Sequence, residues 1–192
     1  MLGQAPAAPP TDFTGQTLAP HMSQLDQIQI SFVAGEDRLL LRVSTQNQEE
    51  FRCWLTRRFV KAIRPALAQA LAAQPRIQTH ADPFARQELL RFEHEAARHS
   101  SDFATPYKGL RRALPLGAAP VLLTRGQIRP QEGGGITLTL APDHGGGIDL
   151  ALNPTLLHSF LALLDQTLLG SDWDLDASVP GSDSILAPTS IN

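Results

Sequence analysis

The spacing of apolar residues changes character twice along this chain of 192 residues. Residues 25–45 alternate between apolar and polar side chains, as a half-buried β-strand requires. Gly35-Glu36-Asp37 supplies a turn within this run, so the run predicts a β-hairpin. Apolar residues then recur at every third or fourth position, which is the spacing of an amphipathic helix. The same change recurs after residue 152, and a chain with both patterns combines strands and helices around a core.

The first helical segment is predicted over residues 48–73. Ser44, Thr45 or Asn47 would cap it by accepting a hydrogen bond from the first turn. Pro65 lies inside the segment and lacks a backbone donor, so we expect it to kink or divide the helix.

Later segments follow the same reasoning. The remaining elements are predicted over residues 83–99 and 154–169 as helices, and over residues 120–128, 135–141 and 147–152 as strands. Glycine-rich turns separate the last three strands. Asn153 is a favourable helix cap, and Pro154 is a favourable first helical residue.

Together these elements predict an α+β fold over residues 24–170, formed as a single domain. We expect a mainly antiparallel sheet of about five strands, with two or three helices packed on one face. Residues 38–63 and 147–169 share the order strand, polar cap and helix, which raises the hypothesis of a degenerate ββα duplication. Strand-to-helix units are common in unrelated folds, so the shared order alone does not establish a duplication.

The two ends differ from this domain in composition. Residues 1–23 are rich in proline and alanine, and we interpret them as a flexible arm. Residues 171–192 contain no lysine or arginine and are interpreted as an acidic flexible tail. The segment Asp172-Trp173-Asp174-Leu175-Asp176 places large apolar side chains between carboxylates, a pattern typical of a short docking motif. It could bind the basic helix, a second copy of the chain or another protein, or it could simply keep the chain soluble.

Charge is distributed unevenly. The chain has 16 basic and 19 acidic residues, and its net charge of −3 excludes a chain that is strongly basic overall. Residues 38–64 nevertheless hold seven basic side chains against Glu49 and Glu50, a local excess of +5. Arg57, Lys61 and Arg64 fall on the polar side of the predicted first helix. This basic face is a candidate docking surface for an acidic protein or for phosphates, and its alternative is a solvated helix face.

Residues suited to catalysis or metal binding do not form a recognisable arrangement. The single cysteine, Cys53, excludes an intramolecular disulfide and a zinc site with several thiolates. His94 and His99 lie five positions apart, which separates them by roughly 140° around a helix. The glycine runs at 133–135 and 145–147 precede strands and lack the lysine of a phosphate-binding loop. The sequence therefore predicts no catalytic residue, no metal site and no cofactor.

Membrane insertion is not expected either. The longest apolar-rich segment, residues 156–169, is shorter than the roughly 20 residues that a membrane span needs. The start of the chain lacks the pattern of a secretory signal, so we expect a cytoplasmic protein.

One segment resembles other proteins. The order RLLLRVST followed by F-R-x-W-L-T-R-R-F is similar to that of small bacterial proteins of proteobacterial type. The resemblance extends more weakly to PVLLTRGQIRP and LNPTLLHSFLALL and so spans most of residues 25–170. It implies no known activity and no site residues.

These observations favour a non-enzymatic module that binds another protein or a second copy of itself, as an accessory subunit of a bacterial assembly. Docking would use the basic helix face, a sheet edge or the acidic tail. The alternative is a nucleic-acid-associated protein whose basic helix contacts phosphates. A third hypothesis is an enzyme with a site near the glycine-rich turns and His144.

Overall fold

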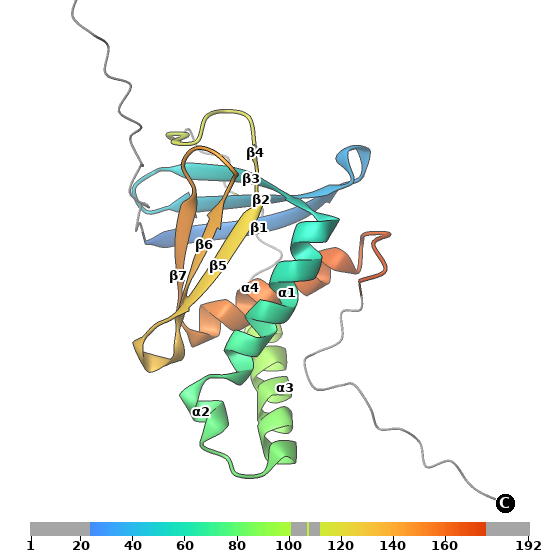
Figure 1. The fold of residues 1–192 in the computed structure, drawn as a ribbon, viewed down its shortest axis with the longest axis vertical. Helices are drawn as coiled ribbons and strands as arrows, with labels where there is room; N and C mark the ends of the chain where they lie inside the picture. The colour runs from blue at the N-terminus through green and yellow to red at the C-terminus, as the bar shows by residue number, and fades with distance from the viewer. Residues whose placement is uncertain (1–23, 101–106, 108–111, 176–192) are drawn as a thin grey trace, which may run out of the picture.

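A computed structural model describes residues 24–100, 107 and 112–175 (Figure 1). The described residues form helices and two β-sheets, which confirms the predicted α+β class. The predicted arm at residues 1–23 lies outside the described residues, as does the tail from residue 176 onward.

The first sheet has four strands in the order β1-β2-β3-β4. They are β1 (Leu25–Val33), β2 (Arg38–Thr45), β3 (Glu50–Thr56) and β4 (Val121–Leu122). The first three pair antiparallel, and β4 pairs parallel with β3. The predicted hairpin is present as β1 and β2, which are joined by the short 3-10 helix η1 (Ala34–Glu36).

The predicted start of the first helix is wrong. Residues 50–56 form strand β3, and helix α1 (Arg57–Ala72) begins only after it. Phe51, Cys53 and Leu55 are buried at every second position, which is the periodicity of a strand. Helix α1 is capped by Thr56, whose hydroxyl accepts a hydrogen bond from the Phe59 N–H (3.2 Å). The expected division at Pro65 is wrong as well, because α1 continues through this exposed residue.

A second sheet takes the order β5-β6-β7 and is antiparallel throughout. Its strands are β5 (Arg125–Pro130), β6 (Ile136–Ala141) and β7 (Ile148–Leu152). The expectation of a single sheet therefore needs correction, because the segment predicted as one strand at 120–128 turns a corner. The Leu123 N–H bonds to Trp54 of the first sheet, whereas the Thr124 N–H bonds to Ala141 of the second.

The helices lie together on one side of the two sheets (Figure 1). Helices α1 and α4 (Pro154–Leu168) contact the strands and each other, while α3 (Pro83–Ser100) packs on α4. A single helical turn, α2 (Pro75–Gln78), links α1 to α3. The predicted cap of α4 is confirmed, because Asn153 Oδ1 accepts a hydrogen bond from the Leu156 N–H (2.9 Å).

The core lies where α1 and α4 meet the inner faces of both sheets. It includes the alternating buried residues of β2, β3, β6 and β7, among them Leu41, Phe51, Leu138 and Leu150. The orders β2-β3-α1 and β6-β7-α4 repeat the ββα plan in separate sheets, and the duplication remains a hypothesis. Among the described residues, no helix is long and apolar enough to cross a membrane.

Candidate functional site

The structure divides the predicted basic face. Arg57 and Lys61 are exposed, but Arg64 turns toward α4. The Arg64 Nε donates to Asp165 Oδ1 (2.6 Å) and its Nη2 donates to Oδ2 (3.2 Å), and both side chains are only 12% exposed. Arg64 therefore holds α1 to α4 and is occupied within the fold.

Other basic residues of this region also have structural partners. Glu50 is buried in β3, and its Oε1 lies 3.0 Å from Arg42 Nη2 and 2.6 Å from Arg52 Nε. Burial by itself would raise the pKa of Glu50, but hydrogen bonds from Arg52 and Arg42 outweigh it and lower the pKa. Much of the local positive charge thus neutralises acids within the sheet and the helices.

The tail segment begins inside the folded part of the chain. Trp173 is buried, and its indole N–H donates to Asp37 Oδ1 in the turn between β1 and β2. Its ring meets the Phe32 ring edge-on, with centroids 5.8 Å apart. The sequence placed the domain boundary before residue 171, whereas the structure uses Trp173 as a core residue.

The other members of the predicted tail motif differ in exposure. Asp172 and Asp174 are exposed, Leu175 is half-buried against the core, and Asp176 lies outside the described residues. The anchor expected to bind a partner, Trp173, is therefore already bound within the chain. It contacts the β1–β2 hairpin through Phe32 and Asp37.

A groove of about 680 Å³ lies between α1 and edge strand β5. It is lined by Phe59, Ala62, Ile63 and Ala66 of α1, by Thr124, Arg125, Gly126 and Gln127, and by Thr139 and Ala141 of β6. Gly126 brings the strand close to the helix, because a Cβ at this position would lie 2.8 Å from Ile63 Cδ1. None of the described residues that line the groove is acidic, and one of them is Arg125.

Strand β5 is an edge strand, and no other described strand pairs with its outer edge. The Gln131 N–H donates to the Gly135 carbonyl (2.8 Å), and the register continues this pairing at the odd-numbered residues of β5. Because such pairs alternate in antiparallel sheets, Gly126 and Ile128 direct their N–H and C=O groups away from β6. Pro130, which has no N–H, falls at an outward position, as expected for an edge strand.

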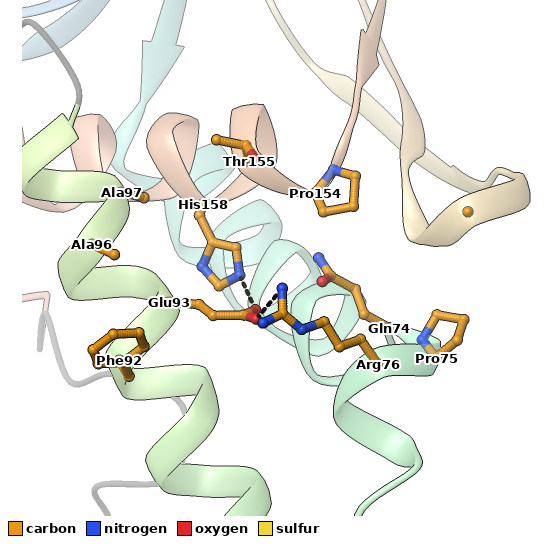
Figure 2. Close-up of a pocket in the computed structure, with 11 residues that line it drawn as sticks. Gln74, Pro75, Arg76, Phe92, Glu93, Ala96, Ala97, Pro154, Thr155 and His158 are labelled. Atoms are coloured by element: carbon orange, nitrogen blue, oxygen red, sulfur yellow. Dashed lines mark ion pairs between the residues drawn. The ribbon is translucent and has the colours of Figure 1, made fainter.

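A second cavity, of about 530 Å³, opens between α2, α3 and α4 (Figure 2). Glu93 of α3 reaches both Arg76 (Nη1–Oε1, 3.0 Å) and His158 of α4 (Nε2–Oε2, 3.4 Å). His158 also faces His94, with ring centroids 6.2 Å apart. Sequence reasoning missed this cluster, because only the packing of α3 on α4 brings residues so distant in the chain together.

The two glycine-rich turns, near which the third hypothesis places an enzymatic site, lie at opposite ends of strand β6. The turn at 131–135 follows β5 and the turn at 142–147 follows β6, so the length of β6 separates the two. Both connect antiparallel strands, as the sequence predicted. Within the described part of the chain, no three His, Cys, Asp or Glu residues are grouped so that they could hold a metal ion.

Comparison with known proteins adds no relative. No protein-family model, curated protein or solved structure matches this chain. Function must therefore be inferred from the sites themselves.

Proposed function

We propose that this protein is a non-enzymatic interaction module that binds an extended segment of another protein in the groove between α1 and β5. The observation that carries the proposal is an apolar helix face beside the edge of strand β5, with which no other described strand pairs. An added strand could bond to the outward N–H and C=O of Gly126 and Ile128, which is how many domains bind extended peptides.

The lining residues indicate what such a segment should look like. Ala62 and Ala66 lie one turn apart on the same face of α1. Because both side chains are small, they leave room for the alternate side chains of a bound strand. Exposed Arg58 lies one turn before Ala62. Arg125 lines the groove and is exposed, and its Nε and Nη2 donate to the Pro142 carbonyl (3.0 and 2.7 Å), which is neutral and leaves the positive charge of the guanidinium unpaired by an acid among the described residues. We therefore expect the bound segment to carry aliphatic side chains, which suit the apolar helix face. We also expect it to contain an acidic residue, because a carboxylate would complement the positive charges of Arg58 and Arg125.

The Arg64–Asp165 ion pair weighs against one alternative, a nucleic-acid-associated protein that uses the basic helix. A phosphate-binding helix would use Arg57, Lys61 and Arg64, but Arg64 is held by Asp165.

We also propose a cytoplasmic location, which is supported by the single buried thiol of Cys53.

The experiment is a selection from a random-peptide display library, followed by affinity measurement with fluorescently labelled peptides. Ala62→Trp fills the groove at an exposed position and should weaken selected peptides at least about tenfold, a free-energy loss of roughly 1.4 kcal/mol. Gln69→Trp is the matched control, because Gln69 is exposed on the same helix but does not line the groove.

Hydrogen exchange provides a second readout. A bound strand should slow exchange of the Gly126 and Ile128 amides, whose N–H groups point outward. Peptides that bind equally well to the Ala62→Trp variant would refute the proposal. If the chain instead forms a dimer through this groove, the occupant is a second copy of the chain and not another protein.

A further inference from the structure

The cavity between α2, α3 and α4 is lined by side chains with buried polar atoms that lack hydrogen-bond partners among the described residues. His158 is 3% exposed, yet neither of its ring nitrogens has a hydrogen-bond partner among the described residues. Gln74 is 4% exposed, and its Nε2 is also unpartnered there. Buried polar groups in proteins nearly always have a partner, so these groups call for one in the cavity that they line.

Glu93 adds an acceptor to the same wall. Its Oε1 lies 3.0 Å from Arg76 Nη1, but the two are not aligned as a hydrogen bond. Its Oε2 lies 3.4 Å from His158 Nε2. Figure 2 shows the Glu93, His158 and Arg76 side chains converging from three helices, with Gln74 beside them.

The charges of this wall cancel. Glu93 and Arg76 are the charged residues that line the cavity in the described part of the chain, and they are paired. The Glu93 carboxylate would repel an anionic ligand, and the Arg76 guanidinium would repel a cationic one. A neutral ligand leaves the ion pair intact.

The polar groups require both a donor and an acceptor from the ligand. The Gln74 amide N–H needs an acceptor, and the Glu93 carboxylate needs a donor. A neutral imidazole at His158 offers one donor and one acceptor. Most of the remaining wall is apolar, formed by Phe92, Ala96, Ala97, Pro75 and Pro154, and Thr155 adds one hydroxyl.

We propose that this cavity binds a small neutral molecule in which an apolar ring carries a carboxamide-type edge. The C=O of that edge accepts from Gln74 or His158, and its N–H donates to Glu93. The ring lies against the apolar wall formed by Phe92 and Ala96. This site is independent of the α1–β5 groove, because no residue lines both cavities.

The test uses three probes of one shape, namely benzamide, benzamidinium and benzoate, which are neutral, cationic and anionic. Binding to the full chain is followed by NMR titration. Benzamide should bind with a Kd of about 1 mM, as expected for so small a ligand, and at least about tenfold more tightly than the two ions. Tighter binding of either ion, or no binding of benzamide, would overturn the proposal.

Variants of α3 locate the binding. Ala96→Trp fills the cavity from an exposed position and should abolish benzamide binding. Gln87→Trp, at an exposed position of α3 outside the cavity, should leave the Kd within about twofold. Glu93→Gln keeps the shape but weakens the acceptor, and it should raise the Kd several-fold. Benzamide binding that survives Ala96→Trp would also refute the assignment.

Discussion

Replacing Trp173 by alanine should destabilise the whole domain, although the residue lies beyond the last helix. Its side chain is 2% exposed, and a buried tryptophan removes 150–250 Å² from water, about 4–6 kcal/mol as an upper bound at ~25 cal/mol per Å². The hydrogen bond from its indole to Asp37 adds about 1 kcal/mol. Residual burial in the unfolded chain reduces the sum, and we expect a loss of about 3–4 kcal/mol.

The loss can be measured by urea denaturation followed by circular dichroism. For a domain of this size, it corresponds to a fall in Tm of about 10 °C. Trp173→Phe should cost less, about 1–2 kcal/mol, because the ring contact with Phe32 is retained and only the indole N–H and part of the ring are lost.

Two controls separate this contact from general effects of changing the tail. Asp172→Ala changes an exposed neighbour and should leave the free energy of unfolding within about 0.5 kcal/mol. Asp37→Asn keeps an acceptor oxygen at a left-handed position (φ 47°) that asparagine tolerates, so it should also be nearly neutral. A Trp173→Ala variant as stable as the wild type would show that Trp173 does not belong to the core.

Three further predictions concern other contacts. Arg64→Ala should cost about 2–4 kcal/mol in urea denaturation, because it leaves the Asp165 carboxylate in a largely buried place without its partner. Gly147→Ala should cost about 1–3 kcal/mol by the same measurement, since the new Cβ would lie 2.5 Å from the Leu140 carbonyl oxygen. Burial and the nearby His94 lower the pKa of His158 to about 4, so the unfolded chain binds more protons between that pH and about 6.5. Stability should therefore fall by up to about 3 kcal/mol as the pH drops through this window, and denaturation at several pH values would measure it.

Each of these has a matched control. Arg57→Ala removes an exposed charge from the same helix and should change stability little, so an equal loss would contradict the role given to the Arg64 ion pair. Gly35→Ala adds a Cβ with no atom within 4 Å, and it should be tolerated. His158→Phe should flatten the pH dependence, and an unchanged slope would assign the effect to other groups.

Local pattern was sufficient for part of this fold. The β1–β2 hairpin, helix α4 with its cap at Asn153, and the glycine turns of the second sheet follow from spacing and turn chemistry. The strand at 50–56 could not be predicted in this way, because Phe51, Leu55 and Phe59 fit the four-residue spacing of a helix as well as the alternation of a strand. Pairing with β2 selects the strand over the helix, and that pairing depends on the tertiary fold and not on local sequence.

The sites were harder to predict for the same reason. The groove depends on a corner at Leu123 and Thr124 that places β5 beside α1. The cavity depends on α3 packing against α4, which brings Glu93 to His158. The sequence singled out Trp173 as an anchor for a partner, whereas in the structure its indole N–H donates to Asp37 of the same chain.

The contact between Trp173 and Asp37 also orders events during synthesis. The two residues are separated by 136 positions, so a ribosome adding about 5–20 residues per second makes Trp173 roughly 7–27 s after Asp37. The β1–β2 hairpin is thus made early and acquires its aromatic neighbour, Trp173, only after α4 has been completed. Interrupting synthesis after α4 would release a chain with every strand and helix of the described fold but with Phe32 lacking that neighbour.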